Sequence, residues 1–242
     1  MTYRFIIRGR NCEKYIEKCL KSVMAQTRSN WTADIILDDP EDSSVGVAGD
    51  LVYCKLNMHV WTRPYRHGLA RNIYEFPMMP DVCHVYEDED VLCFLDADDW
   101  LSVGALHYVD KAYASNPKCL LTHGSYVKVS KGRRTKVSNP YHGEDYRSSP
   151  WRGSHLKTVK WKLFKRLPEE CMKHNGEWLE AASDLAIMIP LMEMAGAQRI
   201  EHVHELIYFW RDSTPQKTKR VLQKKCEAII RAKPRMGKVQ VL

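Results

Sequence analysis

Three short apolar runs, each stopped abruptly by polar residues, constrain what this chain can fold into. The first covers residues 4–8 and ends in Gly9-Arg10-Asn11, the second covers 33–37 and ends in two aspartates, and the third covers 90–95 and ends in Asp-Ala-Asp-Asp. Runs of this length, bounded by turn-forming residues, are typical of buried strands. Apolar residues at helical spacing follow the first run, from Tyr15 to Met24. Strands that alternate with helices predict an α/β fold with a mostly parallel central sheet.

The rest of the chain continues this alternation. We expect helices over Gly68–Phe76 and Val103–Ala114, a strand over Leu120–Val129, a mixture of strand and helix before Val60, and a loop over Asn139–Pro150. A further helix begins near Ser183, and Pro190 should kink it or cost it a hydrogen bond. From Pro215 onward, Leu222, Cys226, Ile229 and Ile230 predict an amphipathic basic helix.

The 242 residues are enough for one large hydrophobic core. No apolar run approaches the roughly 20 residues that span a bilayer, and the N-terminus lacks the features of a signal peptide. We therefore expect a protein kept in a cytosol-like compartment. The eight cysteines are scattered and form no Cys-x-x-Cys pair, so free thiols are favoured over disulfides or zinc.

The net charge of +7 comes mostly from the second half of the chain. Its clusters lie at Lys128–Lys136, Lys157–Arg166 and Lys217–Lys238. Basic surfaces favour anionic partners, such as a nucleotide sugar, a membrane surface or nucleic acid. Each cluster taken alone is more simply explained as a solvated face, and the last one is also compatible with peripheral membrane contact.

In a parallel sheet, ligands bind beyond the carboxyl ends of the strands. The polar residues that stop the three runs should therefore face one crevice. Asp96 and Asp98 emerge from a buried strand, and a hard ion such as Mg²⁺ or Mn²⁺ takes carboxylate and phosphate oxygens as ligands. Alone, Asp-x-Asp is a weak motif, because Asp96 to Asp99 could simply form a turn that caps the next helix.

The segments in their order along the chain resemble the GT-A glycosyltransferases of family 2, over about Phe5 to Trp210. Five segments carry the resemblance: Phe5–Asn11 with the helix after it, Leu37–Ser44 as that family's Val-Asp-Asp-Gly-Ser, Arg66–Asn72 as its Ala-Arg-Asn region, Phe94–Trp100 as its metal-binding motif, and Ser183-Asp184-Leu185 at its Glu-Asp-x. This chain departs from the pattern at Arg8-Gly9-Arg10, at Pro40-Glu41, in the spacing of Gly68–Asn72 and at Ser183. The first two departures lie beside the expected nucleobase pocket.

The resemblance implies a metal-dependent, inverting sugar transfer from a nucleoside-diphosphate sugar, with UDP-sugars favoured, to the hydroxyl of a glycan, glycoprotein or glycolipid. It implies Asp184 as the general base and Mn²⁺ or Mg²⁺ as cofactor, held by Asp98 with help from Asp96. The donor would contact Arg8, Asp38, Asp39, Arg71, Asp96 and Ala97, with Arg71 on the phosphates. His202 and His204 are candidates for a third metal ligand, and Trp178 and Trp210 for the acceptor side. A structural explanation remains open for each: a helix-start carboxylate for Asp184, a solvated helix arginine for Arg71, and partly buried histidines.

The expected organisation is a GT-A domain over residues 1–212 and a basic helical tail over 213–242. The first domain divides into a nucleotide-sugar half, 1–102, and an acceptor half, 103–212. Two alternatives stay open: a nucleotidyltransferase, against which the single glycine after the first strand argues, and a basic nucleic-acid-binding protein. The classes can overlap in a transferase that acts on modified nucleic acid, and a compact enzyme of that kind would suit a virus or phage.

Overall fold

The computed structural model describes residues 1–130, 133–137, 140–141, 143–212 and 217–240. Its strands are β1 (Tyr3–Gly9), β2 (Trp31–Asp38), β3 (Met58–Arg63), β4 (Val91–Asp96), β5 (Trp100–Leu101), β6 (Leu121–Ser130), β7 (Arg133–Val137), β8 (Lys157–Lys160), β9 (Lys173–His174), β10 (Glu177–Trp178) and β11 (Ile200–Arg211). Its α-helices are α1 (Ile16–Met24), α2 (Ser44–Val52), α3 (Leu69–Met78), α4 (Pro80–Cys83), α5 (Ala105–Ser115), α6 (Trp161–Phe164), α7 (Ser183–Ala195) and α8 (Lys217–Ala232), and 3₁₀ turns cover Glu169–Met172 and Ala197–Arg199.

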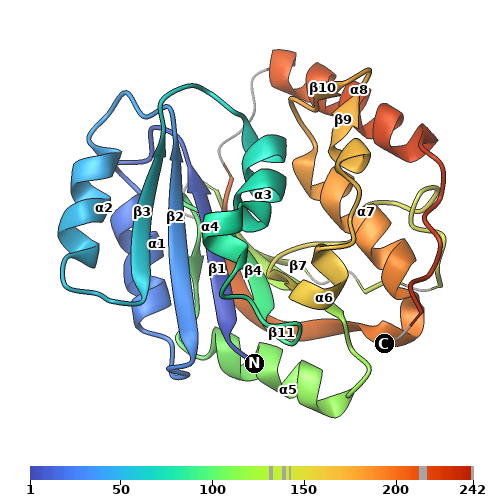
Figure 1. Cartoon of the computed structure of the whole chain (residues 1–242), viewed down its shortest axis with the longest axis horizontal. Helices are drawn as coiled ribbons and strands as arrows, with labels where there is room; N and C mark the ends of the chain where they lie inside the picture. The colour runs from blue at the N-terminus through green and yellow to red at the C-terminus, as the bar shows by residue number, and fades with distance from the viewer. Residues whose placement is uncertain (131–132, 138–139, 142, 213–216, 241–242) are drawn as a thin grey trace.

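One large sheet organises the molecule, in the order β3-β2-β1-β4-β8-β6-β11-β5, with β7 paired to β6. Strands β1 to β4 are parallel neighbours, and β6 and β11 also run parallel. β8 is antiparallel to both β4 and β6, so it joins these two parallel groups. Figure 1 shows the sheet between helices, with α2 on one side of the molecule and α7 and α8 on the other. The predicted α/β fold with a mostly parallel sheet is confirmed.

The apolar runs form strands because both faces of the sheet are covered. In β1, Ile6 belongs to the core cluster that contains α3 and α7, whereas Phe5 and Ile7 belong to the cluster that contains α1 and α5. All three side chains are fully buried, and burial of such a side chain contributes roughly 1.5–3 kcal/mol. A strand buried on both faces needs a continuous apolar run, which is the pattern of the sequence.

The parallel ladders bring the strand ends together. Arg8 lies opposite Asp96 across the β1–β4 pair, and Gly9 lies opposite Leu37 across the β1–β2 pair. A side chain on Gly9 would clash with Ala97, since a Cβ there would lie 2.7 Å from the Ala97 Cβ. The carboxyl ends of β1, β2 and β4 therefore form one edge, as the sequence predicted.

Some predicted elements need correction. The mixed segment before Val60 resolves into α2 and the start of β3. The helix predicted at Ser183 is confirmed and continues through Pro190 to Ala195, with every residue from Leu185 to Ala195 buried; Pro190 has no N–H to donate, so the helix lacks one hydrogen bond there, as predicted. A strand over the segment with His202 and His204 was not predicted: both residues lie in the first half of the 12-residue strand β11.

The tail is helical, as predicted, and α8 packs on α7 through the buried residues Cys226 and Ile230. The predicted boundary at residue 213 lies outside the described residues, so the division into domains stays a prediction. No helix within the described ranges has the length and apolarity that crossing a membrane requires. All eight cysteines are free thiols, five of them buried.

Asp90 offers a test of the fold away from the strand ends. It is 1% exposed, pairs with Arg4 at 2.7 Å and accepts the backbone N–H of Thr2 at 2.7 Å. Its replacement by alanine leaves these donors without an acceptor, so Asp90→Ala should lower the free energy of unfolding by roughly 3 kcal/mol in chemical denaturation. The matched variant Glu17→Ala removes an exposed helical ion pair and should cost less than about 0.5 kcal/mol. Equal losses would contradict the assigned role of Asp90.

Candidate active site

The turn after β4 is fastened to β11 by a buried carboxylate. Asp99 is 1% exposed, and it accepts hydrogen bonds from the Tyr208 hydroxyl at 2.6 Å and from the Arg211 backbone N–H at 2.7 Å. Burial, followed by the charges of Asp96 and Asp98, raises the pKa of Asp99 to about 8. Asp99 therefore holds the turn in place and is not free to bind a ligand.

Arg8 lies beneath the turn and pairs with Asp96. Its Nη2 is 2.5 Å from Asp96 Oδ1, and the Arg8 side chain is only 2% exposed. The contact follows from the register of β1 and β4, which places the two residues side by side. Asp96 thus already has a cationic partner from the protein. Arg8 itself is not accessible to a donor in this structure.

Asp98 has no such partner. No ion pair and no hydrogen bond from another residue reaches its carboxylate among the described residues, and burial, followed by the charge of Asp96, raises its pKa to about 6. A carboxylate that is half-buried and unpaired beside two others fits a divalent cation, which would neutralise the local negative charge. In the described residues, no group of three or more His, Cys, Asp or Glu side chains is placed to hold a metal ion. Mg²⁺ and Mn²⁺ sites commonly use one or two carboxylates together with substrate phosphates, so Asp98 fits this kind of site.

Asp184 lies in the first turn of α7 and pairs with Lys157 at the start of β8. Lys157 Nζ is 2.8 Å from Asp184 Oδ1, and His155 Nε2 is 4.0 Å from Asp184 Oδ2. Burial by itself would raise the pKa of Asp184, but Lys157, His155 and Arg8 outweigh it and hold this pKa well below its ordinary value. Arg8 thus acts electrostatically on Asp184 while it pairs with Asp96, so the two carboxylates lie in one site.

The two aspartates at the end of β2 are engaged with protein groups. Asp38 is buried and accepts the backbone N–H groups of His67 and Gly68 at 2.8 and 2.9 Å. Asp39 pairs with Arg10 at 3.0 Å, and both side chains are about one-third exposed. Asp38 therefore shapes the loop before α3, and Asp39 with Arg10 is the more accessible pair at the expected nucleobase position.

Arg71 and Trp178 lie together on the side of His67, which contacts both Asp38 and the Arg71 partner Glu75. Arg71 forms an ion pair with Glu75 at 2.8 Å, and its guanidinium carbon lies 5.9 Å from the Trp178 ring centroid.

Ala97 is buried against Gly9, and its backbone N–H donates to the Arg8 carbonyl. The side chain of Ala97 therefore points into the core, away from any donor.

Trp210 is connected to Asp184 by a series of ring contacts. The ring of Trp210 lies 5.9 Å from that of Tyr126, and the ring of Tyr126 lies 6.1 Å from that of His155, the neighbour of Asp184. Lys128 lies over Trp210 at 5.0 Å. This row of side chains leads from Asp184 along β6 and β11.

His202 and His204 contact each other and His123, and none of these contacts involves Asp96 or Asp98. Their Nδ1 atoms are 3.2 Å apart, and the rings of His202 and His123 are 4.8 Å apart. In the β11–β6 ladder, His202 pairs with His123. Tyr208, which donates to Asp99, pairs with Tyr126. His123 and Tyr126 are three residues apart on β6, which is roughly 10 Å along the strand. This placement argues against either histidine as a metal ligand beside Asp98.

Lys157 and His155 were not predicted as site residues. Lys157 belongs to the basic cluster Lys157–Arg166, which alone is more simply explained as a solvated face. That explanation is wrong for part of the cluster, because Lys157 is 1% exposed and Lys160 is 8% exposed and paired with Glu89. Only the antiparallel insertion of β8 beside β4 buries them, and no local pattern in the sequence indicates it.

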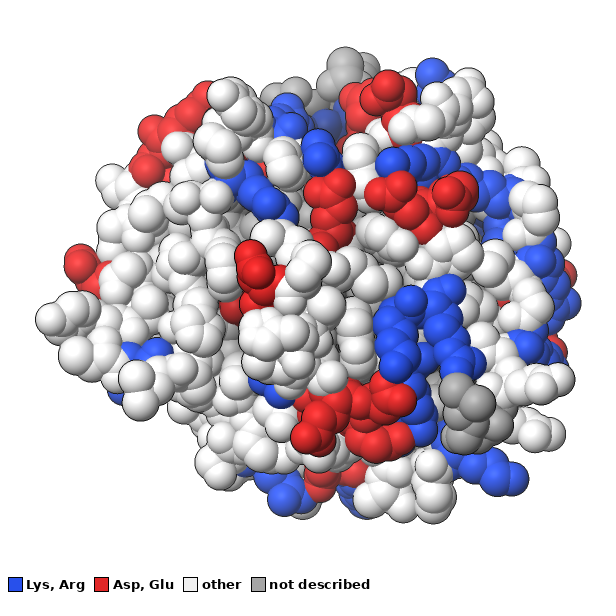
Figure 2. Space-filling view, in the orientation of Figure 1, with Lys and Arg blue, Asp and Glu red and all other residues white. Residues whose placement is uncertain are grey.

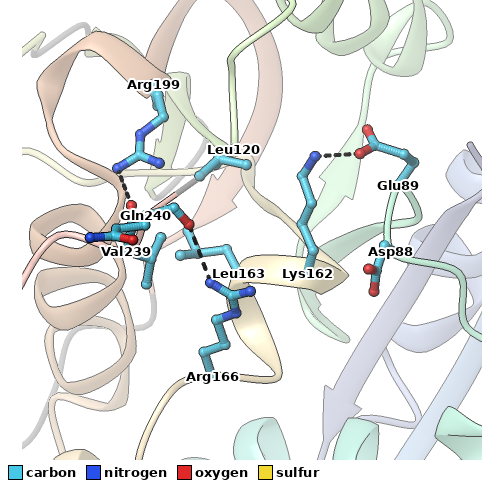
Figure 3. A pocket seen from close by; sticks show the side chains of 9 residues that line it. All are labelled: Asp88, Glu89, Leu120, Lys162, Leu163, Arg166, Arg199, Val239 and Gln240. Carbon is cyan, nitrogen blue, oxygen red and sulfur yellow. Dashed lines mark hydrogen bonds and ion pairs between the residues drawn. The ribbon is translucent and has the colours of Figure 1, made fainter. Parts of the chain in front are cut away.

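A cavity of about 120 Å³ lies at the opposite edge of the sheet, before β4 and β6 begin. Figure 3 shows Lys162 reaching Glu89, and Arg166 and Arg199 reaching the backbone of the C-terminal segment. The lysine and the arginines that line the cavity bind protein carboxylates and carbonyls. The cavity therefore lies at the contact between α6 and the C-terminal tail, separate from the carboxylate site.

The model of glycosyl transferase family 2 matches residues 5–170. Because this match covers more than half of the chain, the chain belongs to that family of glycosyltransferases. The matched segment includes Asp96 and Asp98 and ends before Asp184. No curated protein sequence matches the chain.

Solved structures show the same fold. The chain is similar to S. aureus TarS 1–349 in complex with UDP, with 19% identity and a TM-score of 0.63 over 88% of this chain and 61% of that one. The complex of TarS 1–349 with UDP-GlcNAc gives 18% identity and a TM-score of 0.65 over 89% and 60%. The mannosyltransferase PcManGT from Pyrobaculum calidifontis, in complex with GDP-Man and Mn²⁺, gives 13% identity and a TM-score of 0.59 over 90% and 59%. The chain thus spans about three fifths of each structure. The GT-A fold and the family predicted from the sequence are confirmed.

Three histidines near the site should make stability depend on pH. Burial lowers the pKa of all three histidines, to about 3 for His123 and to about 4 for His155 and His202. The charge of Lys157 adds to this effect for His155, and that of His204 adds to it for His202. An unfolded histidine titrates near pH 6.5. The unfolded chain therefore binds protons that the folded chain does not, and the stability contributed by these neutral histidines is lost as pH falls from about 6.5 to about 4.

The variant His123→Phe should therefore lose less stability than the wild type over this pH range. Asp98 and Asp99 have raised pKa values, so their contribution to stability increases as pH falls, opposite to that of the histidines. Both aspartates are present in the variant and in the wild type, so the difference between the two slopes reports on His123. Chemical denaturation at several pH values measures both slopes. The exposed His174, replaced by Phe, should leave the slope unchanged. Identical slopes for His123→Phe and wild type would contradict the assignment.

Proposed function

We propose that this chain transfers a sugar from a nucleoside-diphosphate sugar to an acceptor hydroxyl, with inversion and with Asp184 as the general base. One observation carries the proposal: two carboxylates with different surroundings share one site. Asp98 has no partner from another residue among the described residues, whereas Asp184 pairs with Lys157 through Oδ1 and keeps Oδ2 free of a hydrogen bond. Asp98 is therefore suited to a divalent cation, and Asp184 has an oxygen that can accept a proton.

Asp98 is the proposed metal ligand, and Asp96, neutralised by Arg8, lies beside it as a further polar contact for the donor. Asp98 would hold Mn²⁺ or Mg²⁺ together with phosphate oxygens of the donor, and such an ion would supply Lewis-acid stabilisation of the charge on the leaving group. The Mn²⁺ in the complex of the similar mannosyltransferase supports this choice of ion. Arg71, half-buried on α3 with its side chain 38% exposed, is the proposed cation for the phosphates.

The nucleobase should lie near Arg10 and Asp39. UDP and UDP-GlcNAc in the TarS complexes favour a UDP-sugar, and GDP-Man in the mannosyltransferase complex keeps a guanine nucleotide open. Because Arg10 and Pro40-Glu41 depart from the family pattern at this position, base selectivity depends on residues particular to this chain.

In the proposed step, the acceptor oxygen forms a bond to the anomeric carbon from the face opposite the diphosphate. Its proton moves to Asp184, and the bond from the anomeric carbon to the diphosphate oxygen breaks with its electron pair on that oxygen. Base catalysis of this kind contributes about 10²–10⁴-fold. Trp210, connected to Asp184 through Tyr126 and His155, is better placed than Trp178 to contact an acceptor sugar.

The two alternative functions have less support. A nucleotidyltransferase would require a glycine-rich phosphate loop after β1, where this chain has the buried Arg8 and a single glycine. A nucleic-acid-binding surface would require a field of one sign, and on the face in Figure 2 basic and acidic side chains lie next to each other.

Replacing Asp184 by asparagine should lower transfer at least about 100-fold, because the amide cannot accept the proton. Nucleotide-sugar binding in the presence of Mn²⁺ should persist in this variant. Asp98→Asn should lose the Mn²⁺-dependent part of binding, and Asp81→Asn, an exposed carboxylate on α4, should change neither property. Calorimetric titration and product analysis measure the two effects. Full transfer by Asp184→Asn would remove it as the base.

The donor can be identified by thermal denaturation with a panel of nucleotide sugars and Mn²⁺. A ligand at 100 times its Kd stabilises the folded state by about 2.7 kcal/mol, which is readily seen as a rise in Tm. We expect UDP-sugars to give the largest rise, and slow hydrolysis of the same donor. If no nucleotide sugar gives a rise or is hydrolysed, the proposed function is wrong.

A further inference from the structure

A lysine that solvent cannot reach lies behind Asp184. Lys157 is 1% exposed, whereas the Asp184 side chain is 29% exposed. A substrate can therefore approach Asp184 from the open side but cannot reach Lys157. A buried ammonium group is costly unless it is paired, and the contact of 2.8 Å with Asp184 Oδ1 supplies the pair.

The strand that carries Lys157 is held rigidly. Lys157 pairs with Phe94 across the β8–β4 ladder, two residues before Asp96. The next residue, Thr158, is hydrogen-bonded through its side chain to Thr122 of β6 and to Tyr113 of α5. The Lys157 ammonium group therefore has a defined position relative to the carboxyl end of β4, and Asp184 is fixed through it.

The two oxygens of Asp184 are not equivalent. Oδ1 contacts Lys157, while Oδ2 is 4.0 Å from His155 Nε2, too far for a hydrogen bond. Oδ2 thus remains available to an incoming hydroxyl. The pairing with Lys157 on one side orients the free oxygen on the other.

The charges that face Asp184 come from three elements. Lys157 lies on β8 and His155 just before it, Arg8 lies on β1, and Asp96, on β4, is paired with Arg8. Among the groups that oppose the effect of burial on the pKa of Asp184, Lys157 is the largest. Burial keeps His155 neutral at physiological pH, so it does not provide the second cation.

We propose that Lys157 is a positioning residue for the transfer reaction, which orients Asp184 through Oδ1 so that Oδ2 receives the acceptor proton. This inference rests on the proposed function of Asp184. It assigns a role in catalysis to a residue that contacts neither donor nor acceptor.

The test compares Lys157→Met, Lys157→Arg, Asp184→Asn and the double variant Lys157→Met/Asp184→Asn. Lys165→Met, which removes an exposed lysine paired with Asp88, is the matched control. Hydrolysis of UDP-GlcNAc and of GDP-mannose with Mn²⁺ serves as the assay, because it needs no acceptor. Donor binding and Tm are measured for every variant, to separate loss of folding from loss of catalysis.

We expect Lys157→Met to lower kcat at least about tenfold near pH 7, with less than about a twofold change in the donor KM. The acidic limb of its pH–rate profile should move toward neutral pH, since burial then acts on Asp184 without its main counter-charge. Lys157→Arg should restore part of kcat and move the limb back. The double variant should be no slower than Asp184→Asn. Should Lys157→Met fail to fold, Lys157→Gln removes the same charge and is held to the same expectations.

The outcomes separate this inference from the proposed function. If Asp184→Asn hydrolyses the donor at the wild-type rate, Asp184 is not the base, and both are wrong. If Asp184→Asn is inactive while Lys157→Met keeps the wild-type kcat and pH profile, the inference is overturned and the function stands. A double variant much slower than Asp184→Asn would show that Lys157 acts independently of Asp184, and it would also overturn the inference.

Discussion

The candidate site depends on two ion pairs buried at the carboxyl edge of the sheet, Arg8 with Asp96 and Lys157 with Asp184. Each pair joins residues far apart in the sequence, and each includes a cation that is at most 2% exposed. A single unpaired charge at either position would carry a desolvation penalty, so removing one member of either pair should destabilise this arrangement of the strands and α7. The fold and the electrostatics of the site are therefore fixed together.

The strands predicted from the sequence lie in the parallel part of the sheet and are buried on both faces. β1, β2 and β4 are apolar throughout, because helices cover the sheet on each side. β8 could not be predicted in this way. It has four residues with a lysine at each end, and it becomes a strand only because β4 and β6 leave a place between them. β11 was missed for a related reason: its polar first half, around His202, lacks alternation and pairs in a ladder with register shifts.

The same distinction applies to the candidate site. That Asp38, Asp96 and Asp98 share one edge follows from where the apolar runs stop, and this was predictable from the sequence. What each carboxylate contacts was not predictable, because the partners come from distant segments. The backbone of His67 and Gly68 engages Asp38, Arg8 engages Asp96, and Asp98 is left open. Residues of one type, in one motif region, thus acquire different chemical roles from contacts that the local sequence does not encode.

The difference between Asp98 and Asp184 follows from how their partners are connected. Asp98 lies in a turn that Asp99 fastens to β11, and the nearby strand cations are engaged elsewhere: Arg8 is paired with Asp96, and Arg211 donates its Nε–H to the backbone carbonyl of Asp98. Negative charge therefore accumulates at Asp98, where a divalent ion is favourable. At Asp184, by contrast, the antiparallel β8 brings Lys157 to the end of β4, where it pairs with the carboxylate. Negative charge at Asp184 is balanced by the protein itself, so a metal ion has less to gain there. The insertion of β8 between two parallel groups of strands is thus the feature that separates the proposed cation-binding carboxylate from the proposed proton-accepting one within a single edge of the sheet.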